Sequence, residues 1–286
     1  MNPPCPSCGA GCTVKHGHFD RTDDAQSVQR YRCKTCGKCF SSATFTSTYR
    51  QKRRRLNRLI EIDLASSTAQ RRIAINHGCT RGTVARKLRF LAAEARRRQR
   101  ALLRSRKPAK HVQWDELITF EHSRLKPLSV AVMMCRETRQ ILCFGVAAIP
   151  ASGLMAKRSR EKYGPRPDRS GRMRHQVLGA IAPHIAPGAL IESDEHARYQ
   201  AEIEEHLPTC THLQYPSQRG SLTGQGELKR TGYDPLFGIN HTLAMMRDNI
   251  KRLTRRTWCT TKLAECLEDQ IAVYVHFHNT TLVARQ

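Results

Sequence analysis

His111-Val-Gln-Trp-Asp-Glu-Leu-Ile-Thr-Phe120 is the stretch that decides the fold of the larger part of this chain. Two further apolar runs follow it, at 128–135 and 141–149, and both are rich in Val, Ile and Ala. Polar residues separate the runs, and Pro150 ends the last one. Short β-branched runs bounded by turn signals predict three antiparallel strands in a meander.

Beyond the meander, strand and helix patterns alternate. The expected elements are a polar, basic insertion at 157–174 that is mobile or faces DNA, a helix at 175–185, a strand at 188–194, a helix at 195–207, a strand at 212–215, a glycine-rich loop at 220–232 and two long helices. Three strands followed by alternating strand and helix is the element order of a ribonuclease-H-like α/β fold. We therefore predict such a domain over residues 108–286.

Two aspartates take positions of interest in this order. Asp115 falls on the first predicted strand, and Asp194 ends the fourth. These strands are neighbours in a sheet of that fold, so both carboxylates can reach one pair of Mg²⁺ or Mn²⁺ ions, which favour hard oxygen ligands. Each residue also has a plainer interpretation, Asp115 as an edge-strand acid beside Glu116 and Asp194 as a helix N-cap. Only their combination indicates a catalytic site.

The middle of the chain is strongly basic. Residues 50–110 hold twenty Lys and Arg against three acidic residues, and they supply most of the formal net charge of +25. Charge concentrated in this way is typical of a surface that contacts a polyanion, because each neutralised phosphate releases counterions. A solvated basic surface is the alternative.

This basic segment has the pattern of a helix-turn-helix. Ser67 and Gln70 match a capping box that opens a short helix, His77-Gly78 interrupts it, and Thr80 can cap a second helix running to about residue 98. The expected core consists of Ile73, Val84, Leu88 and Leu91. The residues expected to meet DNA, early on the second helix, are Arg81, Thr83, Arg86 and Lys87. We predict a DNA-binding domain with a basic linker over residues 49–107, with a plain helical hairpin as the alternative.

The head of the chain carries two C-x2-C knuckles, Cys5-Pro-Ser-Cys8-Gly and Cys33-Lys-Thr-Cys36-Gly. A two-residue gap lets both thiolates of a tight turn face one tetrahedral zinc ion, and the glycine that follows suits a positive φ. The segments at 13–19 and 28–32 alternate like short strands. We predict a zinc ribbon over residues 1–48, held by these four cysteines, with Cys12 and Cys39 as surplus.

The composition also indicates the cellular compartment of the protein. The first eleven residues lack the apolar core of a secretory signal, and the longest apolar run, at 141–149, is far too short to span a bilayer. Twelve cysteines without a signal indicate a reducing compartment. We expect a cytoplasmic, nucleoid-associated protein that is not bound to a membrane.

Three stretches resemble one family. The C-terminal segment from Asp234-Pro-Leu-Phe-Gly-Ile-Asn240 through Arg247-Asp-Asn-Ile-Lys-Arg and on to Lys262 is similar to the last helix of InsA/InsB-type bacterial insertion-sequence transposases. Ser193-Asp194-Glu-His-Ala-Arg-Tyr199 resembles their second acidic motif and Trp114-Asp115-Glu116 their first. The cysteine ribbon and helix-turn-helix resemble their DNA-binding half. The resemblance implies binding of terminal inverted repeats, metal-dependent strand cleavage and strand transfer into target DNA, by an oligomer that brings two ends together.

One position departs from that family. Where such transposases carry a glutamate seven residues before a basic residue, this chain has Asn240 and Arg247. Seven residues are about two helical turns, so both face one side. An asparagine carbonyl can bind a hard cation but brings no charge, and Arg247 would hold a DNA phosphate. Glu227, Asp234 and Asp248 are rival third ligands. The departure leaves a second hypothesis open: a zinc-dependent DNA-binding regulator whose nuclease-like domain is inactive.

Overall fold

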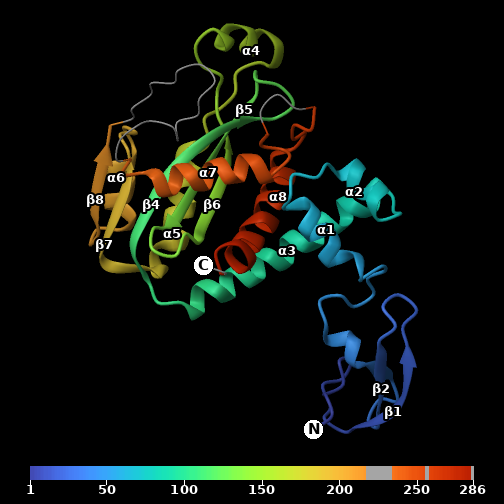
Figure 1. Ribbon diagram of the computed structural model, residues 1–286. Helices are drawn as coiled ribbons and strands as arrows, with labels where there is room; N and C mark the ends of the chain where they lie inside the picture. The colour runs from blue at the N-terminus through green and yellow to red at the C-terminus, as the bar shows by residue number, and fades with distance from the viewer. Residues whose placement is uncertain (217–233, 255–257, 285–286) are drawn as a thin grey trace. The chain divides into compact units, whose positions relative to one another are not determined.

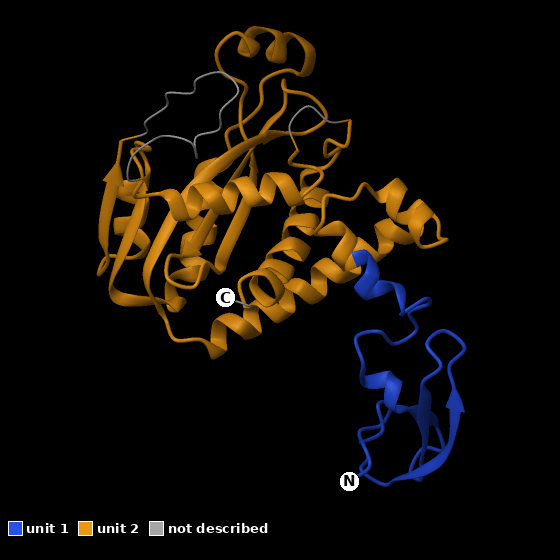
Figure 2. Ribbon diagram, in the orientation of Figure 1, with its two compact units in different colours: residues 1–60 blue, residues 61–286 orange. Residues whose placement is uncertain are grey.

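The computed structural model describes residues 1–216, 234–254 and 258–284. The chain divides into two compact units, residues 1–60 and 61–286 (Figure 2). The basic helices that follow residue 61 therefore belong to the same compact unit as the large sheet. The division into three domains stays a prediction.

The first unit contains a small antiparallel sheet. Its strands are β1 (Thr13–Asp20), β2 (Ser27–Cys33) and β3 (Cys39–Ser41), in the order β1-β2-β3, followed by a 3-10 turn, η1 (Ser42–Phe45). The strands predicted at 13–19 and 28–32 are confirmed. Within residues 1–50 the buried apolar side chains are few, namely Cys5, Val28, Cys33 and Ala43. Two of these are cysteines, so the head has little core apart from its thiols.

Helix α1 (Leu56–Leu64) leads from the first unit into the second, where α2 (Gln70–Asn76) and α3 (Arg81–Ser105) form a packed pair. The expected core is confirmed, because Ile73, Val84, Leu88 and Leu91 are all buried. Thr80 caps α3 as predicted, its hydroxyl oxygen accepting the backbone N–H of Thr83 at 3.2 Å. Helix α3 continues seven residues beyond the predicted end at about residue 98.

The predicted capping box at Ser67 is wrong. Helix α2 begins at Gln70, its N-cap is Ala69, and no side chain caps it. Ser67 instead has a positive φ of 55°, and its backbone N–H donates to the carbonyl of Asn249 at 2.7 Å. Ser67 therefore makes a contact with a distant part of the chain instead of capping α2.

A five-stranded sheet is the centre of the second unit (Figure 1). Its strands are β4 (Ala109–Phe120), β5 (Pro127–Cys135), β6 (Ile141–Ala148), β7 (Ile185–Asp194) and β8 (Thr211–Tyr215). The order is β6-β5-β4-β7-β8; β4, β5 and β6 pair antiparallel, whereas β7 runs parallel to both β4 and β8. The meander and both later strands are confirmed. This mixed sheet is compatible with the predicted ribonuclease-H-like order.

Helices cover both faces of the sheet (Figure 1). One core joins α5 (Ser170–Ile181) and α6 (Tyr199–His206) to one face, and the other joins α7 (Phe237–Asn249) and α8 (Ala264–Phe277) to the opposite face. Short turns η2 (Ala182–His184) and η4 (His278–Leu282) follow α5 and α8. The predicted final helices are thus confirmed.

The segment 157–174, which we expected to be a mobile or DNA-facing insertion, is largely helical, and its contact with DNA stays a prediction. Helix α4 (Met155–Tyr163) occupies the first half, and α5 begins at Ser170. Met173 and Arg174 are buried, so the second half of the segment packs on the sheet. The glycine-rich loop at 220–232, with the rival ligand Glu227, lies outside the described residues.

Candidate functional site

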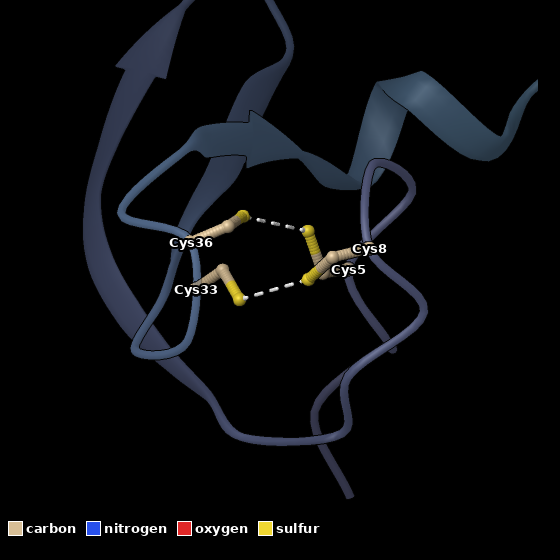
Figure 3. Close-up of side chains that lie close together, drawn as sticks. All are labelled: Cys5, Cys8, Cys33 and Cys36. Atoms are coloured by element: carbon tan, nitrogen blue, oxygen red, sulfur yellow. Dashed lines mark hydrogen bonds between the residues drawn. The ribbon is translucent and has the colours of Figure 1, made fainter.

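The four predicted zinc ligands come together in the first unit. Cys5 and Cys8 on one turn face Cys33 and Cys36 on another, with sulfur separations of 3.7 Å for Cys5–Cys36 and 3.6 Å for Cys8–Cys33 (Figure 3). Four sulfurs, each about 2.3 Å from a tetrahedral zinc ion, lie about 3.8 Å apart. The observed separations fit that ion, and the residues form a possible four-cysteine metal site.

The two knuckles share one backbone design. In each, the first cysteine donates its N–H to the residue five positions later, and the glycine after the second cysteine donates back to it. Gly9 and Gly37 have φ values of +73° and +72°, the left-handed conformation that the sequence predicted for both. The knuckles therefore hold their sulfurs in place by main-chain geometry. Cys12 and Cys39 are exposed and do not belong to the cluster.

The electrostatics of the cluster favour partial ionisation. Backbone N–H groups, first that of Cys36, lower the pKa of Cys33 to about 6. The N–H of Ser7 likewise lowers the pKa of Cys5, whereas for Cys8 the backbone N–H of Ala10 lowers the pKa but hydrogen bonds with the other thiols, first that of Cys36, raise it to about 12. Thiolates are the form that binds metal, so the main chain prepares this site for a cation.

The second site lies where β4 and β7 run side by side. Trp114 pairs with Ser193 in the parallel register, so the next residues on the two strands, Asp115 and Asp194, are neighbours. Oδ1 of Asp194 is buried and has no hydrogen-bond partner in the described part of the chain. A buried carboxylate oxygen without a donor is costly, and a bound cation would compensate that cost.

The two carboxylates act on each other. Burial and then the negative charge of Asp194 raise the pKa of Asp115 to about 7, although the backbone N–H of Glu116 and the charge of Arg247 oppose the rise. Two neighbouring carboxyl groups, each of which disfavours ionisation of the other, are typical of a site that binds a cation. Arg247 supplies only part of it.

Helix α7 carries the third predicted group. Asn240 is half-buried in its first turn, and its side-chain Nδ2 donates to Oδ2 of Asp234 at 3.0 Å. Arg247, two turns later, is near enough to Asp115 to affect its pKa. The structure therefore brings Arg247 to the acidic pair, while the contact it gives for Asn240 is with Asp234.

A buried polar contact fixes the start of α7 against the sheet. Oε1 of Gln113 accepts a hydrogen bond from the backbone N–H of Ile239 at 2.8 Å. Nε2 of Gln113 donates to the carbonyl of Pro235 and to Oε2 of Glu192, both at 2.8 Å. A Cβ on Gly238 would stand 2.4 Å from Oε1 of Gln113, so only glycine permits this approach. Gln113 and Glu192 each precede one of the two aspartates by two residues, and Gln113 joins the start of α7 to β4.

The opposite face of β4 has a different polar group. Glu116 accepts hydrogen bonds from the Ser129 hydroxyl and from Nη1 of Arg174, the latter at 3.1 Å. Arg174, 2% exposed, also makes a bidentate pair with Glu202 at 2.6 and 2.9 Å. Arg174 thus partners both carboxylates, so this group supports the layer of α5 and α6 rather than chemistry.

The predicted DNA-contacting residues divide into two kinds. Arg81 and Arg86 are exposed early on α3, and Thr83 is half-buried. Lys87 is only 4% exposed, because it lies three residues after Val84 on the buried face of the helix. Its inclusion among surface contacts is not supported by its position.

The sequence also left some site residues unidentified. Gln113 and Glu192 are buried polar residues in otherwise apolar strands, and each shares a strand face with one of the aspartates. A polar residue two positions before a candidate ligand was the available signal. The ion pair of Arg174 on α5 with Glu116 on β4 could not be predicted in this way, since Arg174 lies in a run of basic residues.

Comparison with known proteins adds little. No known protein family matches the sequence, and no curated protein matches it. Among solved structures, the crystal structure of a pre-cleavage Mos1 transpososome is similar over 60% of this chain and 60% of that chain, with 12% identity and a TM-score of 0.20. In the described ranges, no helix is long and apolar enough to cross a membrane.

Proposed function

We propose that this chain is a DNA transposase of an insertion sequence, which binds terminal inverted repeats and catalyses metal-dependent strand cleavage and strand transfer. One observation carries the proposal: Asp115 and Asp194 adjoin on neighbouring strands with Arg247 close by. The family resemblance of the surrounding motifs supports the same function. Its partners would be the DNA of the element ends and of the target, bound by a homo-oligomer.

The residues fit divalent cations. Asp115 and Asp194 offer hard oxygen ligands, and the partnerless Oδ1 of Asp194 is suited to one of them. When bound, a pair of Mg²⁺ or Mn²⁺ ions would activate the attacking oxygen and stabilise the leaving oxygen of an in-line phosphoryl displacement. Arg247 would hold a phosphate against the acidic pair.

Asn240 suits the third position of the metal site. Because Asp234 can only accept a hydrogen bond, the group facing it must be the Nδ2 amide of Asn240. That contact fixes the orientation of the side chain and keeps the amide carbonyl oxygen available for a cation. A neutral ligand should weaken metal binding without preventing the reaction, since two-metal chemistry needs no side-chain base here.

Two other regions would bind DNA. Arg81 and Arg86 stand exposed on the capped first turns of α3, where a recognition helix meets a groove. The four-cysteine head would hold a structural zinc ion and contribute a second module. Binding of this kind should weaken steeply as salt rises.

A zinc-dependent DNA-binding regulator with an inactive nuclease-like domain is the second candidate. Asn240, in place of the glutamate of the resembling family, favours it. Asn240→Glu separates the two functions: a natural chain that cleaves DNA supports the transposase, whereas cleavage that appears only in the variant supports the regulator.

The decisive experiment is a strand-transfer assay. Inverted repeats in the DNA that flanks the gene would supply the substrate, with Mg²⁺ or Mn²⁺ as the metal. Asp115→Ala and Asp194→Ala should each abolish cleavage, whereas Glu204→Ala, which removes an exposed carboxylate on α6, should leave it unchanged. Undiminished strand transfer in either aspartate variant would refute the proposed site.

The zinc head has its own test. Metal analysis of the chain should find a zinc ion that Cys33→Ser releases, and the ribbon should unfold with it because its apolar core is small. Cys39→Ser removes an exposed cysteine outside the cluster and is the matched control. A head that folds without metal would contradict the ribbon.

A further inference from the structure

A second cluster of metal-ligating side chains joins α5 to α6. Nδ1 of His175 lies 2.9 Å from Nε2 of His206. The carboxylate of Glu205 extends beside both rings, with 3.6 Å between Oε2 and Nδ1 of His175 and 3.8 Å between Oε1 and Nε2 of His206. Three potential ligand atoms thus lie within 4.8 Å of one another.

We propose that His175, Glu205 and His206 form a second metal site, which takes a transition-metal ion such as Zn²⁺. Two nitrogens bound at about 2.0–2.1 Å to one ion lie about 2.9–3.4 Å apart, depending on the angle between the bonds. The nitrogen separation falls within that range. Imidazole together with one carboxylate favours Zn²⁺ over Mg²⁺, since Mg²⁺ prefers oxygen ligands.

A hydrogen bond between the two rings is the competing explanation. It would account for the nitrogen separation, because one neutral ring can donate to the other. It leaves the Glu205 carboxylate too far from either nitrogen for a hydrogen bond of its own. One cation bound by all three groups gives every one of them a partner.

The position of the cluster favours a cation. Glu205 and His206 end α6, where the unpaired carbonyl groups of the last turn carry partial negative charge. The side chains are 41%, 62% and 21% exposed for His175, Glu205 and His206, so an ion could enter from solvent and keep water in its remaining coordination positions. Three protein ligands with an open position is a common zinc arrangement.

The metal would strengthen a contact that the fold already makes. His175 follows Arg174, and Glu205 lies one turn after Glu202, so the ion would join the two helices just outside their buried ion pair. Residues 199–206 extend α6 by about 10 Å from the end nearer Asp194. The site is therefore separate from the acidic pair, and it does not depend on the transposase proposal.

Titration of Zn²⁺ into the full chain already holding zinc at its four cysteines tests the proposal. Calorimetry should detect one further ion per chain, and the melting temperature should rise with its occupancy. His175→Ala and His206→Ala should each weaken this second event by more than about tenfold, since losing even an outer partner of a ligand costs that much. His184→Ala and Glu204→Gln, which alter neighbouring groups outside the cluster, should preserve it.

Spectroscopy separates the two sites. Co²⁺ at the four cysteines gives intense thiolate charge-transfer absorption, whereas Co²⁺ at nitrogen and oxygen ligands gives only weak visible bands. The weak bands should vanish in His206→Ala while the intense ones persist. A second Zn²⁺ event that is absent from the natural chain, or that survives in the variant lacking both histidines, would overturn the proposal.

Discussion

Two kinds of carboxylate lie within a few residues of each other in the central sheet. Glu116 and Glu192 are surrounded by donors: Glu116 has Ser129 and Arg174, and Glu192 is bound by Gln113. Asp115 and Asp194 instead face each other, and one oxygen of Asp194 has no donor among the described residues. The comparison teaches that burial alone does not mark a functional acid. The distinguishing property is the buried oxygen Oδ1 of Asp194, which has no donor among the described residues.

The largest effect is expected for the aspartate pair, at Asp194, whose Oδ1 has no donor among the described residues. Asp194→Asn should slow strand cleavage by about a thousandfold or more, because it removes charge that would hold the catalytic cations. The free energy of unfolding should not fall, since the lost carboxylate has a partnerless buried oxygen. Cleavage kinetics and chemical denaturation measure the two outcomes. A variant that is unstable yet active would reverse the assignment.

The compensated side should respond in the opposite way. Arg174→Met leaves Glu116 and Glu202 buried without their cation, so the free energy of unfolding should fall by about 3–5 kcal/mol. Arg172→Met, which removes an exposed charge two residues earlier, should have little effect. Equal losses in both variants would mean that the buried pair has no special role in stability.

Acid titration sharpens the comparison further. Burial and Asp194 raise the pKa of Asp115 from 3.8 to about 7, so ionisation of Asp115 in the folded chain is unfavourable. The cost is absent below about pH 4, grows as the pH rises toward 7 and is constant above. Without divalent cations, the stability advantage of Asp115→Asn should therefore grow by about 2.5 kcal/mol between pH 5 and pH 8. Denaturation of both proteins at the two pH values tests this, and an advantage that shrinks would contradict it.

The smallest effect concerns Gln113, which joins β4 to the start of α7. Gln113→Leu leaves the N–H of Ile239 and the carbonyl of Pro235 without their partner, at a cost of about 1–2 kcal/mol in stability. Cleavage should also slow by about tenfold, because α7 carries Arg247 and a small displacement of a catalytic group is costly. Gln176→Leu, on the exposed side of α5, is the control. Unchanged cleavage in Gln113→Leu would show that α7 does not need this contact.

Local pattern was enough to predict part of this structure. The β-branched runs defined the meander, and the topology then made Asp115 and Asp194 neighbours. The knuckles predicted their own left-handed glycines, because a two-residue turn has few solutions. These features depend on residues close in sequence or on a simple rule of strand order.

The errors and omissions have a common cause. Ser67 adopts its conformation because of Asn249, far along the chain, and Lys87 is buried because α3 packs on that face. The partners of Gln113 come from two distant segments, β7 and the start of α7. No local periodicity reports contacts of this kind, so the polar groups that position the site were visible only in the folded chain.

Helix α8 gives the fold an order of assembly. It packs along α3, where Arg96 meets Asp269 at 2.7 Å. Just beyond α8, Asn279 of η4 donates its Nδ2 to Gln99 of α3 at 3.0 Å. During synthesis, α3 leaves the ribosome more than 150 residues before this partner exists. Gln99 also donates to the carbonyls of Ile141 and Leu142 on β6, so α8 completes at the end of translation a contact between α3 and the sheet that forms earlier. A chain interrupted before Ala264 would leave uncovered the face of α3 that packs on α8.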